Sequence, residues 1–297
     1  MKCNLCPRKC GADREHGQIG YCGMGSKVTA SRASLHMWEE PCISGNGGSG
    51  TIFFSGCNLR CVFCQNREIA SGGKGIEIST QRLSEIFIEQ QERGAENINL
   101  VTPGHFAGRI REALVNAKEQ GLIIPVVYNT SSYESADTLQ QFEGLIDIYL
   151  ADFKYMSSKM SARYSSAPDY AKIAKEAVAK MVHQTGAPEF DKSGIMRKGV
   201  IVRHLMLPGG LKDSKAVLRY LYRTYRDTIY YSIMNQYTPI NIPEEYSEIN
   251  RHVSEREYED LIRYAVSLGI ENGFVQEGDT AQESFIPDFD GKGIVRE

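Results

Sequence analysis

The run GTIFFSGCNLRCVFCQN, residues 50–66, joins an apolar segment to three closely spaced cysteines. Its apolar part, Thr51–Ser55, has the length and composition of a buried strand. Cys57, Cys61 and Cys64 follow with the spacing C-x3-C-x2-C, so one loop at the carboxyl end of that strand gathers three thiols. A [4Fe–4S] cluster usually takes four cysteines, and three leave one iron without a protein ligand. Because a reactive metal site keeps an open position, the spacing predicts a reactive [4Fe–4S] cluster on these residues.

The alternatives for this triplet are a structural zinc site and thiols that bind no metal. A zinc site with three cysteines usually recruits a histidine, and the nearest one, His36, lies upstream of the predicted strand. Cys42 is the only other nearby thiol that could complete the cluster, and nothing in its spacing favours that role. The position of the triplet directly after a strand favours the open cluster.

Downstream of Gly50, short apolar runs alternate with longer segments of helical period, which is typical of βα units around a parallel sheet. The expected strands are Thr51–Ser55, Asn97–Val101, Ile123–Tyr128, Ile146–Ala151, Val200–Leu207 and Thr228–Ile233. The expected helices are Gln81–Arg93, Gly108–Gln120, Ser135–Phe142, Tyr170–His183, Lys212–Thr224 and Ser254–Leu268. These units are too few to close a full barrel, so we predict an α/β fold, a partial (β/α)6 TIM-type barrel with a C-terminal extension over residues 51–297. In such folds the loops at the carboxyl ends of the strands carry the chemistry.

The cysteine triplet resembles the defining motif of the radical S-adenosylmethionine (SAM) superfamily. More narrowly, residues 50–66 resemble the pyruvate formate-lyase activating enzyme-like subgroup. The resemblance implies an oxidoreductase in which SAM binds the open iron through its amino and carboxylate groups. One electron, from a reductant such as flavodoxin or ferredoxin, then splits SAM into methionine and a 5′-deoxyadenosyl radical that abstracts hydrogen. It also implies that Phe63, the residue before the third cysteine, packs on the adenine.

Two further strand ends carry residues that suit SAM. The superfamily has a Gly-Gly-Glu-like segment after the second strand, where backbone groups hold the methionyl ammonium, and this chain has there Thr102, Pro103, Gly104 and His105. No acid is present among them, and the alternative is an ordinary βα turn. After the third strand, Asn129 and Ser131 offer an amide and a hydroxyl for ribose or carboxylate hydrogen bonds, although the same residue types also cap helices.

The catalytic candidates are two polar pairs on the later strands. Asp152 and Lys154 are two residues apart on a strand and so point to one face; they resemble the Asp-x-Lys strand end of glycyl-radical activating enzymes. Arg203 and His204 interrupt an apolar strand, and the resemblance places them near the bound nucleotide. The alternatives are a surface ion pair for the first two residues and a core histidine for His204.

Residues 1–50 form a separate, poorly periodic segment that we expect a metal to organise. Before any predicted strand, this segment supplies four thiols, those of Cys3, Cys6, Cys10 and Cys22. Four ligands close a tetrahedral zinc site or complete an auxiliary iron–sulfur cluster, and the sequence leaves both open, beside thiols that bind no metal. Glycyl-radical activating enzymes place their extra clusters after the radical motif, so this N-terminal position departs from their pattern.

Composition narrows the partners and the compartment. The 34 basic and 37 acidic side chains give a formal net charge of -3, so charge gives no reason to expect a nucleic acid. We expect no signal peptide or membrane span. Thiols crowded into the first fifth of the chain are more often metal ligands than disulfides, so we expect a cytoplasmic protein. The resemblance implies a glycine of a protein backbone as substrate. A peptide, an RNA base and a small metabolite are alternatives, and an iron–sulfur electron-transfer protein is the rival class.

Overall fold

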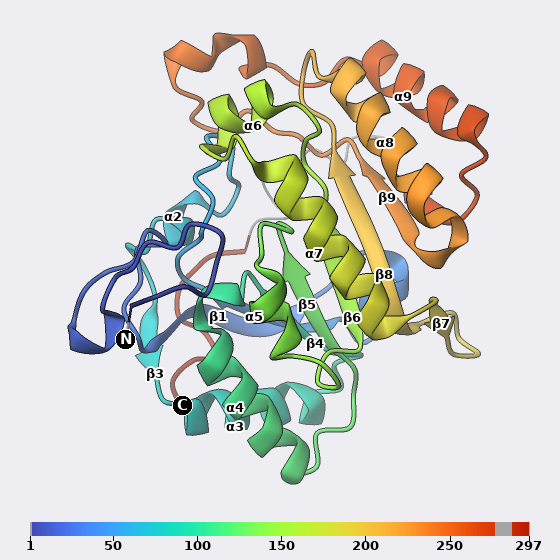
Figure 1. Ribbon diagram of the computed structural model, residues 1–297. Helices are drawn as coiled ribbons and strands as arrows, with labels where there is room; N and C mark the ends of the chain where they lie inside the picture. Colours follow the sequence, from blue (N-terminus) through green and yellow to red (C-terminus); the bar gives the residue numbers. More distant parts are fainter. Residues whose placement is uncertain (1, 277–286, 297) are drawn as a thin grey trace.

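The computed structural model describes residues 2–276 and 287–296 (Figure 1). Seven parallel strands form the body of one open sheet, and their order along it is β2, β4, β5, β6, β8, β9 and β10. Their bounds are Ser49–Phe54, Ile98–Val101, Val126–Thr130, Ile148–Asp152, Met196–Leu205, Tyr230–Met234 and Gly273–Val275. The first six correspond to the predicted strands, so the predicted α/β fold, a partial TIM-type barrel, is confirmed.

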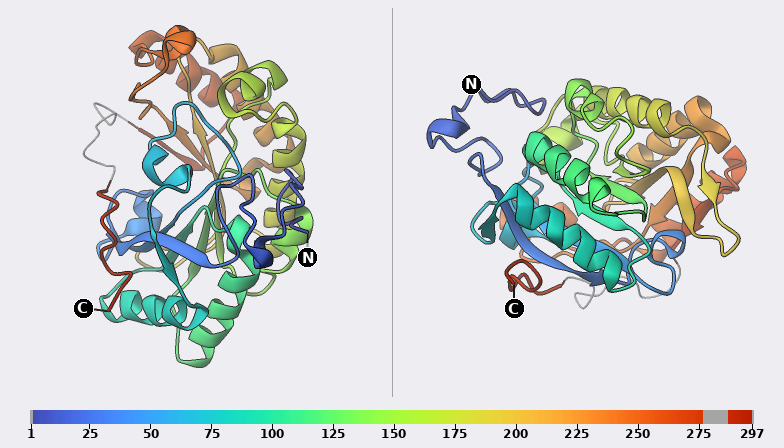
Figure 2. Two further views of the ribbon diagram at one scale, coloured as in Figure 1. Left: turned by 90° about the vertical axis from the view of Figure 1, so that its left-hand side faces the viewer. Right: turned by 90° about the horizontal axis from the view of Figure 1, so that it is seen from below.

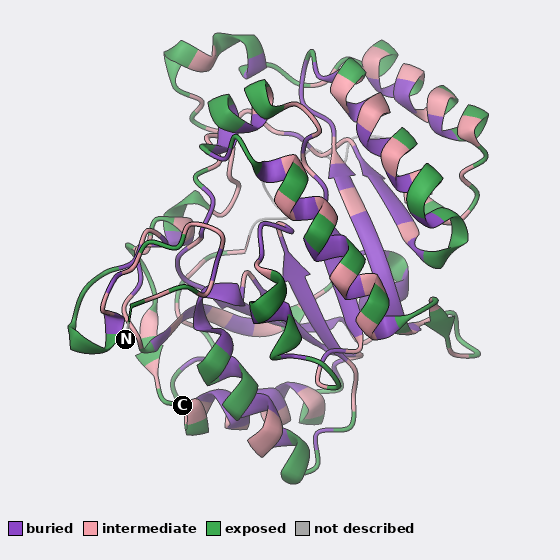
Figure 3. Ribbon diagram, viewed as in Figure 1, coloured by how far each residue is buried: buried purple, intermediate pink, exposed green. Residues whose placement is uncertain are grey.

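Helices cover the outer face of the curved sheet (Figures 1 and 2). The long ones are α3 (Thr80–Glu92), α4 (Ala107–Glu119), α7 (Tyr170–Thr185), α8 (Leu211–Tyr225) and α9 (Glu255–Leu268). All five were predicted, as was the shorter α5 (Ala136–Gln140), whereas α6 (Ser158–Ser165) was not. Strands β4 and β5 are buried along their whole length, as expected when both faces of a parallel sheet are covered (Figure 3).

The sheet also contains a strand from the segment that we expected to be poorly periodic. Strand β1 (Val28–His36) pairs antiparallel with β2, and β3 (Ile76–Ile78) pairs antiparallel with β1. Residues 28–36 are therefore part of the sheet and need no metal to organise them. Small and polar residues dominate β1, and neighbouring strands cover its buried residues: Ala30 and Ala33 pair with β2, and Val28 pairs with β3. Since β1 runs against its neighbours, the chain leaves it at the amino ends of the parallel strands.

Both ends of the described chain pack on the barrel. Residues 2–27 lie against the loops that follow β2, β4 and β5 (Figure 2): the Arg14 side chain donates to the His105 carbonyl at 2.6 Å, and the Ser135 hydroxyl donates to the Leu5 carbonyl at 3.1 Å. Residues 287–296 lie against β1 and α3, where the Ala33 amide donates to the Lys292 carbonyl at 2.9 Å. Other short elements are α1 (Pro41–Ser44), α2 (Arg67–Ala70) and β7 (Glu189–Phe190), which pairs with β8.

Candidate active site

The three cysteines of the loop after β2 separate two cavities. Cys57, Cys61 and Cys64 all line a central cavity of about 250 Å³ at the carboxyl ends of the strands. The same three line an outer cavity of about 270 Å³ on the side of Tyr21 and Cys22. We call residues 57–64 the cysteine loop.

The N-terminal segment holds the cysteine loop in place. The Cys57 amide donates to the Cys22 carbonyl at 3.2 Å. Gly56, just before it, has φ +85, and a Cβ atom there would lie 2.7 Å from the Cys22 carbonyl oxygen and 2.4 Å from Met24 Cγ. Only glycine allows this close approach. At the other end of the loop, the Ser165 hydroxyl donates to Cys61 Sγ at 3.0 Å.

The chemistry of the three thiols fits a metal cluster. Burial raises the pKa of all three, and the neighbouring thiols raise the pKa of Cys57 and of Cys64 further, the latter to about 11. Without a cation they would hold their protons at neutral pH, and bound iron would displace these protons. In the described part of the chain no three Cys, His, Asp or Glu side chains are arranged to hold one metal ion. A cubane does not need that arrangement because each thiolate binds a different iron.

A network of ion pairs lies at the base of the central cavity. Asp152 ends β6 and stands in register with Arg203 of β8. Its carboxylate accepts from Lys154 Nζ at 2.6 Å and from Arg203 Nε at 2.8 Å. Arg203 also donates to Asn129 Oδ1 at 2.6 Å. Of the four catalytic candidates, the structure brings these three, Asp152, Lys154 and Arg203, to the cavity wall.

Glu39 completes this network, and the sequence analysis missed it. Its carboxylate accepts from Arg203 Nη1 at 3.1 Å, from Asn99 Nδ2 at 2.8 Å and from Asn129 Nδ2 at 3.3 Å. Its side chain is 10% exposed, and it reaches the barrel interior from the segment between β1 and α1. In the sequence, the only local sign of a functional role for Glu39 is that it and Glu40 are adjacent acids before Pro41. Their position under the barrel depends on the antiparallel course of β1, which was not predicted.

The members of the network stabilise one another's charges. Burial alone would raise the pKa of Asp152, but Arg203 and Lys154 outweigh it and hold that pKa below its usual value. Burial would lower the pKa of Lys154, but Asp152 and Cys61 keep it raised. Glu39 and Asp152 thus face Lys154 and Arg203, two negative charges against two positive ones. Burial raises the pKa of the neighbouring Glu40 carboxyl.

The loop after β4 meets the cavity at one residue only. Thr102 lines the central cavity, has φ +58 and donates its amide to the Asn129 carbonyl at 2.8 Å. Pro103, Gly104 and His105 do not line it. A Cβ atom at Gly104 would lie 2.2 Å from Glu134 Oε2, so the absent side chain makes room for Glu134.

Two buried groups support that loop. The Glu134 carboxylate accepts from the Thr130 hydroxyl at 2.9 Å, and burial raises its pKa to about 7. His105 lies 2.7 Å through Nε2 from the Ser55 carbonyl, and burial lowers its pKa to about 4. A neutral imidazole donates in this contact, so His105 ties the loops after β2 and β4 together.

The remaining nucleotide-binding candidates face the central cavity, whereas the catalytic candidate His204 does not. Phe63, Asn129 and Ser131 all line the central cavity. His204 does not, because side chains alternate along β8 and it points to the face opposite Arg203. It lies 2.8 Å through Nδ1 from the Phe153 carbonyl, and burial lowers its pKa to about 4.

The four N-terminal thiols come together. Burial raises the pKa of Cys6 to about 11, and nearby Cys22 and Cys3 contribute to the rise. Cys10 lies beside Cys3, and an added Cβ atom at Gly20 would lie 3.3 Å from Cys22 Sγ and 3.7 Å from Cys10 Sγ. They are not arranged to hold a single ion as they stand, so a metal at this site stays a prediction.

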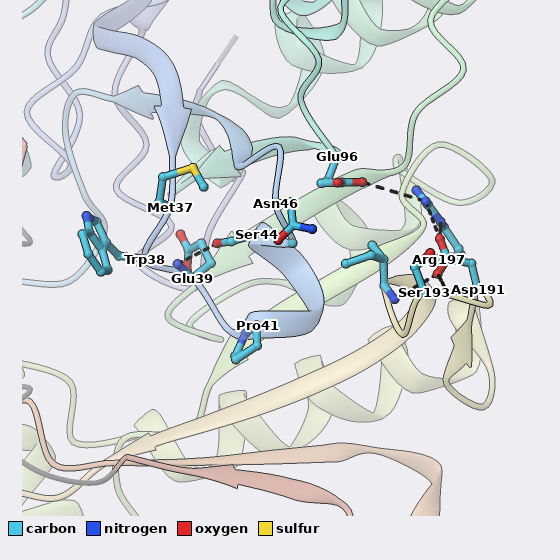
Figure 4. Close-up of a pocket in the computed structure, with 12 residues that line it drawn as sticks. Met37, Trp38, Glu39, Pro41, Ser44, Asn46, Glu96, Asp191, Ser193 and Arg197 are labelled. Atoms are coloured by element: carbon cyan, nitrogen blue, oxygen red, sulfur yellow. Dashed lines mark hydrogen bonds and ion pairs between the residues drawn. The ribbon is translucent and has the colours of Figure 1, made fainter.

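A third cavity, of about 660 Å³, lies at the amino ends of the strands (Figure 4). It shares Trp38 and Glu39 with the central cavity but none of the cysteines. Within this cavity Arg197 forms ion pairs with Asp191, at 2.5 Å, and with Glu96, at 3.9 Å. These three charges are therefore paired. None of the residues predicted for SAM or metal binding lines this cavity.

Among known families, the model of the radical SAM superfamily matches residues 51–189 of this chain. Uncharacterized protein MJ0674 of Methanocaldococcus jannaschii is 27% identical over 276 residues, 91% of this chain and 75% of that protein. Among solved structures, Streptococcus suis SuiB bound to S-adenosylmethionine has a TM-score of 0.52 at 14% identity, over 74% of this chain and 48% of that one. HydG, a maturase of the [FeFe]-hydrogenase, has a TM-score of 0.51 at 13% identity, over 80% and 53%. The chain thus spans about half the length of these structures, and at such identities they share the fold. No helix in the described residues is long and apolar enough to cross a membrane.

Proposed function

We propose that this chain is an enzyme that cleaves SAM reductively to begin radical chemistry, because its residues 51–189 match the model of the radical SAM superfamily, whose members use a [4Fe–4S] cluster and SAM. Cys57, Cys61 and Cys64 hold the cluster, which supplies the electron for cleavage and an open iron for SAM. The observation that carries the proposal is that these three thiols line the same cavity as the network of Asp152, Lys154 and Arg203.

The chain's own residues then bind and orient the nucleotide. Phe63 offers an aromatic face for adenine, and Thr102, Asn129 and Ser131 offer polar groups from neighbouring strands. Fixed, ionised side chains at the base of the cavity hold a polar ligand in one orientation, which is how positioning accelerates a reaction. Pro103, Gly104, His105 and His204 act through the loops and strands that they support.

The substrate proposal rests on the resemblance of residues 50–66 to the pyruvate formate-lyase activating enzyme-like subgroup. It favours hydrogen abstraction from a glycine of a protein backbone, with a peptide, an RNA base or a small metabolite as alternatives. Clustered thiols without disulfides support a cytoplasmic location, where a one-electron carrier such as flavodoxin or ferredoxin is the reductant.

The N-terminal thiols Cys3, Cys6, Cys10 and Cys22 form the proposed second metal site, for zinc or an auxiliary cluster. Its contacts with two loops of the barrel support a structural role: the Cys22 carbonyl accepts from the Cys57 amide of the cysteine loop, and Arg14 donates to the His105 carbonyl of the loop after β4. A metal that fixes this segment would also fix the loop.

The test is anaerobic reduction with dithionite in the presence of SAM, followed by chromatography for 5′-deoxyadenosine. Wild type should form it, and serine at Cys57, Cys61 or Cys64 should each abolish it. If one such variant kept the wild-type rate, the ligand assignment would fall; if reconstituted wild type formed none, the electron-transfer class would replace the enzyme. An iron, sulfide and zinc count on a variant without the four N-terminal thiols identifies the second metal. That variant should be less stable yet keep a cleavage-competent cluster.

A further inference from the structure

The outer cavity, on the other side of the cysteine loop from the central cavity, has an arginine-rich edge. Arg60 and Arg67 line it together with Tyr21. The guanidinium carbons of Arg8 and Arg60 each lie 4.4 Å from the centre of the Tyr21 ring. We call Arg8, Arg60 and Arg67 the arginine rim.

The guanidinium groups of the rim donate hydrogen bonds to backbone carbonyls. Arg60 donates to the Tyr21 carbonyl at 3.1 Å. Arg67 donates to the carbonyls of Val62 and Asn241 at 3.1 and 2.9 Å. Arg8 donates to the carbonyls of Asn58 at 2.9 Å, Ser165 at 3.4 Å and Ser166 at 2.6 Å.

Within residues 2–276 and 287–296, no carboxylate forms an ion pair with these guanidinium groups. None of the ion pairs there includes a member of the rim. The chain as a whole has a formal net charge of -3, whereas the rim brings three guanidinium groups together. The network in the central cavity differs, because there every charge has an opposite neighbour.

The rim surrounds a short route to the thiols. Arg60 and Arg67 are exposed, and the three cysteines of the loop form the wall of the cavity that they edge. A partner seated on the rim therefore approaches the cluster ligands without entering the central cavity, where SAM is proposed to bind. The two sides of the loop can be used at the same time.

We propose that the arginine rim is the docking surface of an acidic one-electron carrier protein. This rests on the proposed function, since the carrier loses one electron, the cluster gains it, and no atom or proton moves. Transient redox partners bury little surface, and opposite charges then supply orientation and association rate. Three guanidinium groups without a carboxylate partner in the described chain, beside an aromatic ring, suit that kind of contact. A nucleic acid is the competing occupant, and charge compensation of the thiolates is the competing role.

The test measures binding of an oxidised, acidic flavodoxin to the reconstituted holoenzyme by calorimetry, so that no turnover is needed. Arg60→Glu should raise Kd about 10-fold at low ionic strength, because one charge is reversed at the contact. The difference should vanish in about 1 M salt, where screening is nearly complete. The matched control is Arg219→Glu at an exposed position of α8, which changes net charge equally and should leave Kd unaltered. Arg60→Lys keeps the charge and should bind like wild type, and Arg60→Gln serves if the glutamate variant does not fold.

Activity gives an independent arm. With reduced flavodoxin, 5′-deoxyadenosine formation should fall in the Arg60→Glu variant. With photoreduced 5-deazaflavin, a small reductant that needs no docking surface, the loss relative to wild type should be about 10-fold smaller than with flavodoxin. Equal loss with both reductants would assign the rim to the cluster and overturn the proposal, as would unchanged flavodoxin binding. Binding of a short single-stranded RNA that depends on Arg60, without flavodoxin binding, would also overturn it. If flavodoxin binds through Arg60 but no reductant yields product, the docking surface stands and the SAM-cleavage proposal fails.

Discussion

Replacing Glu39 tests whether the network at the base of the central cavity is built as the distances indicate. Glu39→Ala removes a 10% exposed carboxylate that accepts from Arg203, Asn99 and Asn129. The network then keeps both positive charges, of Lys154 and Arg203, but only one negative charge, of Asp152. One buried positive charge is left uncompensated. Removing one partner of a buried ion pair typically costs about 3–5 kcal/mol, and the slight exposure here favours the lower end, about 3 kcal/mol. Glu39→Gln keeps the shape but turns an amide toward the guanidinium, and we expect about 2 kcal/mol.

Two measurements check this prediction against a matched control. Urea unfolding should be followed by circular dichroism, because the single tryptophan, Trp38, adjoins the substitution and would report local change. The rate of 5′-deoxyadenosine formation should fall about 10- to 100-fold at unchanged iron content, since Arg203 loses one of its anchors. The control is Glu96→Gln, whose carboxylate lies 3.9 Å from Arg197 at the edge of the third cavity. It should cost less than about 1 kcal/mol and leave the rate alone. Equal effects of the two substitutions would refute the reasoning.

Other substitutions separate the residues that face the cavity from those that only support it. Alanine at Asp152, Lys154 or Arg203 should slow 5′-deoxyadenosine formation about 10- to 1000-fold with the iron count unchanged, whereas His204→Ala should lower stability and leave the rate per folded molecule near wild type. Unchanged rates in the first three would discard this map of the site. Glu134 predicts a pH dependence: burial raises its pKa to about 7, so its contribution to stability is full below the unfolded pKa of about 4.3 and is lost as pH rises through about 7. Urea midpoints between pH 5 and 8 should fall with pH more steeply in wild type than in Glu134→Gln, and parallel curves would contradict the assignment.

The sequence predicts an element correctly when the contacts that form it are between residues close together in the chain. The six predicted strands were found because each is a compact apolar run, such as Val126–Thr130, buried at every position. The cysteine loop was found because its three thiols fall within eight residues. Strand β1 was missed because its burial comes from a partner strand rather than from its own composition.

The ion-pair network at the base of the central cavity could be predicted only in part. Asp152 and Arg203 were both candidates, and parallel register brings them together as strand ends should meet. Glu39 pairs with Arg203 across 164 positions of sequence, and no spacing rule connects them. Its place in the network depends on the course of β1, which carries the chain under the barrel.

The loop after β4 shows a different limit. Thr102, Pro103, Gly104 and His105 were assigned to SAM from their place after the second predicted strand, yet of these only Thr102 lines the central cavity. The space beside Gly104 is filled by Glu134, which comes from the loop after β5. The sequence thus predicts which loops lie at the mouth of the barrel, whereas the packing of one loop on the next decides which side chains reach the cavity.

The two sides of the cysteine loop differ in how charge is arranged, and this difference has a physical use. On the central side Asp152 and Glu39 balance Lys154 and Arg203, so the cavity can take up a small ligand that carries both signs of charge without strong net attraction or repulsion. On the outer side Arg60 and Arg67 are exposed and form no ion pair within the described residues, and in the proposed docking such charges would attract an acidic partner over about a Debye length. In the proposed arrangement, SAM binds on the central side of the cysteine loop and the electron carrier docks on its outer side.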